Sequence, residues 1–330
     1  MNNLKHNIRY EIDFIKYTKL IRYMIFAIVI VFVLNINTLN KTFNVLNKTF
    51  QSTVKEVEKN GDDVEKLLND DFYVREVIQE DGSILLQIDN IVRYDYEQLK
   101  LQYDKMQPTN IFFEVLKNST LIFLPIIAGL FAIYISTYEF SSNTLKTRIL
   151  NGTTETVFLS KVLSTVIVFT IVFVLSAIIG LFISVVWSSI VNLGIDISFI
   201  LPKQSLFNIV INTFKALLIA YLISIVFLVI GFGLGIISSR FSVALGIFLL
   251  YHLVVPNLGK YDIKNLIMNL YYLVFNPEIG VSIINFSELN IPTVGSLITI
   301  TVLLFLITGF IKFREMSKYT VWNKTVNLYC

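Results

Sequence analysis

Residues 162–195 read VLSTVIVFTIVFVLSAIIGLFISVVWSSIVNLGI, which is 34 consecutive residues without Asp, Glu, Lys or Arg. A helix needs about 20 mostly apolar residues to cross a bilayer core, where lipid offers the backbone no hydrogen-bond partners. Five further charge-free windows of comparable length lie at residues 23–40, 118–138, 216–239, 241–259 and 289–311. We therefore predict an all-α polytopic membrane protein with six transmembrane helices.

The composition of the whole chain agrees with this prediction. Of 330 residues, 55% are hydrophobic and only 15% are charged, whereas soluble domains carry about 25% charged residues. A soluble globular enzyme is therefore excluded. The single cysteine, Cys330, permits neither an internal disulfide nor a CxxC site. We expect no metal, no bound cofactor, no catalytic residue and no nucleic-acid partner.

Basic residues in the short flanks predict the orientation, because cytoplasmic loops carry an excess of Lys and Arg. If the N-terminus is cytoplasmic, the inner segments hold 13 basic residues and the two short outer loops hold three. Both termini are then cytoplasmic, and residues 312–330 form a cytoplasmic tail. The same count places residues 40–117 outside, as an extracytoplasmic domain between helices 1 and 2.

The N-terminal 40 residues predict two helices. Residues 1–20 carry Leu4, Ile8, Ile12 and Ile15 at helical spacing, so we expect a helix lying in the inner membrane interface. A plain cytoplasmic extension of the first span is the alternative. Residues 21–39 form transmembrane helix 1, and residues 118–330 contain helices 2–6. Within them, residues 264–277 have too short an apolar run to cross, which indicates a re-entrant or interfacial segment.

The extracytoplasmic domain, residues 40–117, is predicted to be small and either α or α+β. The first span continues outward as a helix until Gly61-Asp62, and Asp62 caps a second helix through Leu68. Segments 73–79 and 84–88 flank a turn at 80–83, which is a hairpin signal. A helix over residues 94–106 follows.

The cytoplasmic segment 139–161, between the second and third spans, carries the most specific pattern. A carboxylate, Glu139, closes the second span, and a short basic amphipathic piece follows it. Gly152 ends that piece, and Thr153 or Thr154 caps the next helix. An ordinary solvated connection is the alternative reading. The candidate residues of this segment are Glu139, Thr144, Leu145, Lys146, Arg148, Gly152 and Lys161.

Three glycines in the fourth span, Gly231, Gly233 and Gly235, permit either close helix packing or local unwinding. The sequence does not choose between a packing surface and a flexing element of a transport pathway. No GxxxxGK[ST] phosphate loop occurs in the chain. Any ATP hydrolysis is therefore expected in another protein.

The segment 139–161 resembles the corresponding connection in ABC-2 type permeases, with the pattern E-F-x-x-G-T-L-x-x-x-L-x-x-G. Glu139, Phe140, Thr144, Leu145 and Gly152 match, and Leu150 lies one position after the second leucine of the pattern. Asn143 stands where glycine is usual, and Lys161 ends the run that follows, as in that family. The resemblance implies that this segment contains a coupling helix, which docks on a separate ABC ATPase dimer. It also implies pairing with a second permease subunit, identical or different, in a bacterial plasma membrane. Arg148 and Lys146 would then meet acidic groups on the ATPase.

These features predict the membrane subunit of an ABC exporter. Its cargo would be hydrophobic or amphipathic, such as an antimicrobial peptide, an antibiotic or a lipid. The acidic outer domain favours a cationic peptide. A non-transport sensor or immunity protein, binding a ligand through residues 40–117, is the alternative. A secondary transporter is disfavoured because the six windows contain no carboxylate.

Overall fold

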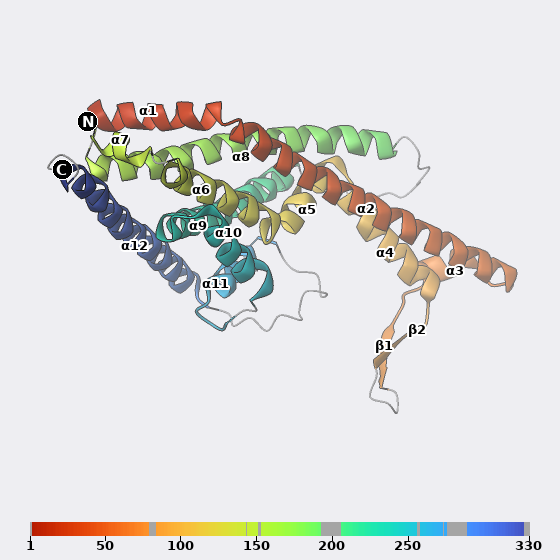
Figure 1. The fold of residues 1–330 in the computed structure, drawn as a ribbon. Helices are drawn as coiled ribbons and strands as arrows, with labels where there is room; N and C mark the ends of the chain where they lie inside the picture. The colour runs from red at the N-terminus through yellow and green to blue at the C-terminus, as the bar shows by residue number, and fades with distance from the viewer. Residues whose placement is uncertain are drawn as a thin grey trace. The chain divides into compact units, whose positions relative to one another are not determined.

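The computed structural model describes residues 2–78, 84–142, 144–150, 153–192, 206–255, 258–272, 274–275 and 289–326 (Figure 1). Helices dominate these residues, and one two-stranded antiparallel sheet accompanies them. The chain divides into two compact units. Unit 1 comprises Met1–Phe32, Leu116–Leu181 and Leu206–Cys330, and unit 2 comprises Val33–Val115 and Phe182–Ser205.

Five helices in the described residues are long and apolar enough to cross a membrane. They are α2 (Leu20–Lys59), α6 (Phe123–Ser141), α8 (Thr154–Asn192), α9 (Leu206–Ser238) and α12 (Ile291–Val326). Many of their apolar side chains are exposed, such as Ile178 on α8 and Ile307 on α12. An exposed apolar surface of this extent fits lipid, and it would be costly in water. The all-α membrane class is confirmed at this level.

The remaining predicted span, residues 241–259, is shorter in the structure. It consists of α10 (Phe241–Leu249) and a π-helical turn, η1 (Leu250–Val254), and the Val255 N–H donates to Leu250 C=O. Together they make a short apolar helix over Phe241–Val254, which is less than the roughly 20 residues that a spanning helix needs. The fifth predicted span, and with it the count of six, therefore stays a prediction.

The other helices of unit 1 flank these spans. The predicted N-terminal helix is confirmed as α1 (Asn2–Tyr17), and Lys19 at φ 59° separates it from α2. Its place at a membrane interface stays a prediction. Short helix α7 spans Leu145–Leu150 and α11 spans Ile263–Tyr272. The helix α11 covers part of the predicted re-entrant segment, and residues 273 and 276–277 of that segment lie outside the described residues.

Glycines bring the helices of unit 1 into close contact. An added Cβ on Gly231 of α9 would lie 2.6 Å from the carbonyl oxygen of Gly129 on α6. One on Gly235 would lie 1.9 Å from Ser136 Oγ, and one on Gly233 would lie 3.0 Å from Phe305 on α12. The helix α9 runs unbroken through all three. These glycines therefore lie at helix contacts, where small residues allow backbones to approach.

Unit 2 contains α2 from Val33 onward and the elements that follow it. They are α3 (Val64–Asn69), β1 (Val74–Ile78), β2 (Ile84–Ile88), α4 (Ile91–Lys105) and most of α5 (Pro108–Thr120). Its core joins Phe43 of α2 to Leu99 and Met106, and Gln102 Nε2 donates to Leu39 C=O at 3.0 Å.

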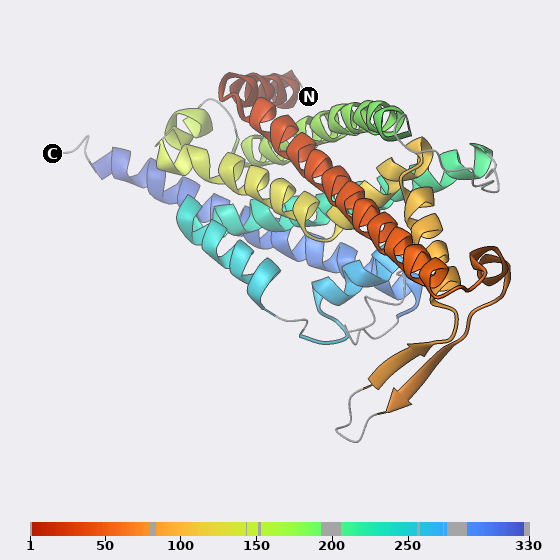
Figure 2. The same cartoon turned by 90° about the vertical axis from the view of Figure 1, so that its right-hand side faces the viewer.

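The predicted elements of residues 40–106 are confirmed with small shifts. The helix continuing outward ends at Lys59, and Gly61 has φ 83°. Asp63 caps α3 in place of the predicted Asp62, because its side chain accepts from two N–H groups of the first turn. Figures 1 and 2 show the hairpin β1–β2 extending away from α3 and α4. The helix α5 was not predicted.

Candidate functional site

The connection between α6 and α8 forms the candidate site in unit 1. Ser141 and Ser142 close α6 by donating their hydroxyls to Tyr138 C=O. Thr153 caps α8, because its Oγ1 accepts from Thr156 N–H at 3.3 Å, as predicted. The helix α7 lies between them, and it is only one and a half turns long. Neighbouring elements must therefore hold it in place.

Four charged side chains meet at the base of this connection. Arg148 Nη1 on α7 donates to Glu139 Oε1 on α6 at 2.5 Å, and it also pairs with Glu11 Oε1 on α1. Lys161 Nζ on α8 lies 2.8 Å from Glu139 Oε2. Two cations thus face two carboxylates, and the cluster has no net charge. We call Glu11, Glu139, Arg148 and Lys161 the charge cluster.

The charge cluster is almost completely excluded from solvent. Glu11 is 1% exposed, Glu139 5% and Lys161 2%, and the Arg148 side chain is 10% exposed. Burying charges costs several kcal/mol per ion in proteins, so they are retained only when they are paired. The cluster therefore binds α1, α6, α7 and α8 to one another, since each helix supplies one member.

Helix α1 contributes more than Glu11 to this junction. The Tyr10 ring lies under the Arg148 guanidinium, with 4.6 Å between Cζ and the ring centroid. Phe14 packs on Tyr138 of α6 at a centroid distance of 4.6 Å. Burial lowers the pKa of Arg148, but the neighbouring carboxylates Glu11 and Glu139 raise it further, so the guanidinium stays charged.

Helix α12 packs against the same ends of α6 and α8. Phe313 contacts Phe140 of α6 at 6.2 Å and Phe158 of α8 at 5.6 Å between ring centroids. The Thr154 hydroxyl donates to Ser317 Oγ at 3.4 Å. The junction is therefore supported from α12 as well as from α1.

The other predicted residues of segment 139–161 do not belong to the charge cluster. Leu145 is buried, and exposed Thr144 lies 2.9 Å from Ser142 between hydroxyl oxygens. Lys146 lies in α7, but its side chain is outside the described set, as is all of Gly152. Arg148 was predicted to meet acids on a partner. That contact stays a prediction, and within the chain Arg148 pairs with Glu11 and Glu139.

Glu11 was missed by the sequence analysis, although a signal was present. It lies three residues after Ile8 and four before Ile15, so it falls on the apolar stripe of its helix. A carboxylate on an otherwise apolar face requires a buried partner. Among the described residues, no three His, Cys, Asp or Glu side chains gather as a candidate metal site.

Burial raises the pKa of Glu11 above its usual 4.5, although Lys161 and Arg148 act against it. A raised acid pKa favours folding at low pH, and this contribution is lost as the pH rises through the folded-state pKa. We expect the melting temperature of the wild type, measured relative to that of Glu11→Gln, to fall as the pH rises from about 4.5 to 7, because only the wild type ionises this side chain. Melting curves of both purified proteins across this range test it. A Glu11→Gln deficit that grows with pH would contradict it.

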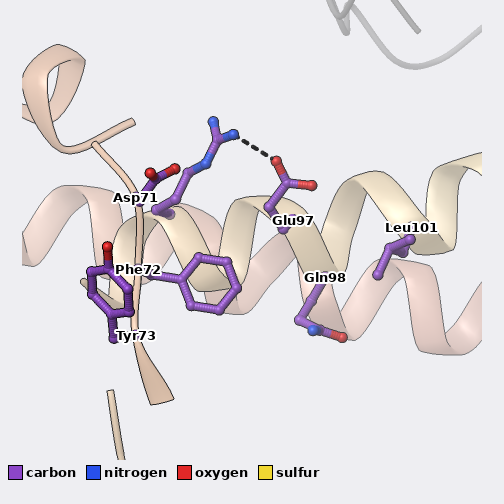
Figure 3. A pocket seen from close by; sticks show the side chains of 7 residues that line it. Asp71, Phe72, Tyr73, Glu97, Gln98 and Leu101 are labelled. Atoms are coloured by element: carbon purple, nitrogen blue, oxygen red, sulfur yellow. Dashed lines mark ion pairs between the residues drawn. The ribbon is translucent and has the colours of Figure 1, made fainter. Parts of the chain in front are cut away.

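Unit 2 contains a second candidate site, a pocket of about 420 Å³ at the base of the hairpin (Figure 3). Arg93 is fixed there, because it donates to Leu68 C=O at 2.6 Å and pairs with Glu97 at 2.8 Å. Aromatic rings and carboxylates suit a cationic or aromatic side chain. The lining residues are Asp71, Phe72, Tyr73, Arg93, Glu97, Gln98 and Leu101.

No family model, curated protein or solved structure matches the chain. The assignment of function therefore rests on the sequence pattern and on the geometry of these two sites.

Proposed function

We propose that the chain is the membrane-spanning subunit of an ABC exporter, powered by ATP that a separate subunit hydrolyses. The observation that carries this proposal is the charge cluster. It fastens a short helix, α7, to the ends of two long apolar helices through buried ion pairs. An external protein that pushes α7 would therefore move α6 and α8, because buried pairs resist separation.

Motion at α7 has a continuous route into the membrane helices. Glu139 belongs to α6, and α6 packs on α9 through the close approach of Gly129 and Gly231. Lys161 belongs to α8, and the aromatic contacts of Phe158 connect α8 to α9 and α12. ATP-driven closure of the ATPase subunits would tilt these helices and open a path for cargo between two permease subunits.

The apolar helices favour hydrophobic or amphipathic cargo, because the predicted spans offer no charged lining for an ion or a sugar. The charge cluster is itself neutral and enclosed. We assign it to force transmission and not to ion binding. In this proposal the chain binds ATP only through its partner, and both termini face the cytoplasm.

The first test is purification of the tagged chain from its native membranes in mild detergent. We expect a P-loop ATPase to copurify in stoichiometric amount. Gly152→Trp, two positions after the last residue of α7 in the sequence, should reduce ATPase copurification or uncouple ATP hydrolysis from transport by about tenfold or more. The matched control is Gly295→Trp on α12, because an added Cβ there meets nothing within 4 Å. Unchanged copurification and transport in Gly152→Trp would contradict the coupling role of α7.

The pocket in unit 2 favours one alternative, a membrane sensor or immunity protein that binds a ligand outside the cell. That function requires no ATPase and tolerates changes in α7. If no ATPase copurifies in several detergents, and ligand binding maps to unit 2, the alternative replaces the exporter.

A further inference from the structure

The negative charge of residues 40–117 is concentrated in one short segment. The segment 70–89 contains six acidic residues and one basic residue, Arg75, which gives a net charge of −5. The rest of 40–117 contains nine acidic and nine basic residues, and it is therefore neutral. This segment comprises the hairpin and its base. The acidic residues are Asp70, Asp71, Glu76, Glu80, Asp81 and Asp89.

The base of the hairpin is locked by Asp89. Its Oδ1 accepts from Tyr73 N–H at 2.7 Å and from Asn90 N–H at 2.8 Å. Asn90 in turn caps α4 and donates to Leu67 C=O at 2.7 Å. The hairpin thus has a fixed root on α3 and α4.

Both outer edges of the two-stranded hairpin lack a partner strand among the described residues, and the edge of β1 is the one that directly follows the pocket residues 71–73. Asp89 N–H donates to Tyr73 C=O, and β1 pairs with β2 in the register Val74↔Ile88. In an antiparallel pair, hydrogen-bonded positions alternate with positions whose N–H and C=O groups point away. The backbone groups of Val74, Glu76 and Ile78 therefore point to the outer edge of β1. Among the described residues no third strand pairs there.

An isolated two-stranded hairpin is marginally stable in water, and an open edge is a template for another strand. The register also places two apolar residues, Val74 of β1 and Ile88 of β2, directly opposite each other. Such a hairpin gains stability when an amphipathic strand is added.

The negative charge of segment 70–89 determines which kind of partner can bind at the edge of β1. A second copy of this hairpin would bring the same net charge of −5 and be repelled. An anionic bilayer surface would be repelled for the same reason. A cationic, extended peptide is attracted by the charge and can pair its backbone with β1. The pocket formed with Asp71, Phe72 and Tyr73, just before β1, can hold one of its side chains.

We propose that the hairpin is a receptor arm for cationic amphipathic peptides, which add as a strand to the open edge of β1 and anchor one side chain in the pocket. This inference deepens the proposed function, on which it rests, because it names the class of cargo. Recognition is by charge, alternating side chains and backbone pairing, so it does not require one peptide sequence.

The test measures binding of a fluorescent peptide of alternating lysine and valine, about ten residues long. The full chain is held in nanodiscs of zwitterionic lipid without ATP. We expect binding that weakens with added salt, and no binding of the matched peptide with glutamate in place of lysine. Glu76→Pro should weaken binding about tenfold more than Glu76→Gln, because both lose the charge but only proline loses the edge donor. The lysine–valine peptide methylated on alternate backbone nitrogens should bind to the wild-type protein as weakly as the unmethylated peptide binds to Glu76→Pro.

Three results would overturn the inference: equal affinity for the lysine and glutamate peptides, equal affinity of Glu76→Pro and Glu76→Gln, or full binding of the methylated peptide. Stronger binding to empty anionic nanodiscs than to the protein would assign the peptide to lipid and also overturn it. The proposed function has a separate readout. If an ATPase copurifies with the chain but the chain does not bind the peptide, the exporter proposal stands and only the receptor role of the hairpin is rejected.

Discussion

Replacing Arg148 with methionine is expected to abolish the folded state of unit 1 or to lower its melting temperature sharply. The substitution leaves the buried carboxylates of Glu11 and Glu139 with only Lys161 as a counter-charge, so one of them must take up a proton or stay unpaired. Breaking a buried pair in this way costs about 3–5 kcal/mol. Domains are stable by only about 5–15 kcal/mol. Thermal melting followed by fluorescence-detected size exclusion measures the loss.

The control variants separate charge balance from the loss of a large side chain. Arg314→Met removes an exposed arginine of α12, and we expect it to melt near the wild type. The double variant Arg148→Met with Glu11→Gln restores neutrality, so it should recover most of the stability. Transport should not recover with it, because α7 has lost its pair with α6. Wild-type stability in Arg148→Met alone would show that the charge cluster does not hold the junction.

The elements that the sequence predicted correctly are those with a local signal. The strands β1 and β2 and the helix α4 follow from periodicity and turn residues within a few positions, whereas the predicted turn at 80–83 lies outside the described residues. The continuation of the first span as a helix up to the residues before Gly61 also follows from local periodicity. The pair between Arg148 and Glu11 joins residues 137 positions apart. No local pattern in the sequence reveals a contact over that separation, so this pairing within the chain was not predicted.

The fifth predicted span, residues 241–259, shows a second limit of the sequence. A charge-free window over 241–259 indicates only that lipid would accept the side chains. It does not indicate whether the backbone remains helical, and here the helix changes to a π-turn at Leu250 and ends at Val254. The role of the glycines in α9 was also left undecided by the sequence, which permits close helix packing and local unwinding equally. The contact of Gly231 with Gly129 depends on α6, which is distant in the chain.

That contact gives the second large expected effect. In Gly231→Ala the new Cβ would lie 2.6 Å from the Gly129 carbonyl oxygen and 2.9 Å from its Cα. Both are backbone atoms of a helix, so they cannot rotate away, and α6 and α9 must separate. Overpacking of this kind costs about 1–3 kcal/mol. Gly231→Leu should be worse, and we expect it to prevent assembly of the membrane helices.

Gly246→Ala on α10 is the matched control, because its Cβ would meet nothing within 4 Å. Alanine is favoured over glycine in a helix by about 1 kcal/mol, so this variant should melt at or above the wild-type temperature. Gly235→Ala should lie between the two, since its Cβ meets the Ser136 hydroxyl, a side-chain atom that can rotate. The order of melting temperatures, Gly246→Ala highest and Gly231→Ala lowest, therefore reports backbone contact between α6 and α9. If Gly231→Ala melts with Gly246→Ala, the two helices do not touch there. The route that connects the charge cluster to α9 would then have to run through α8 instead.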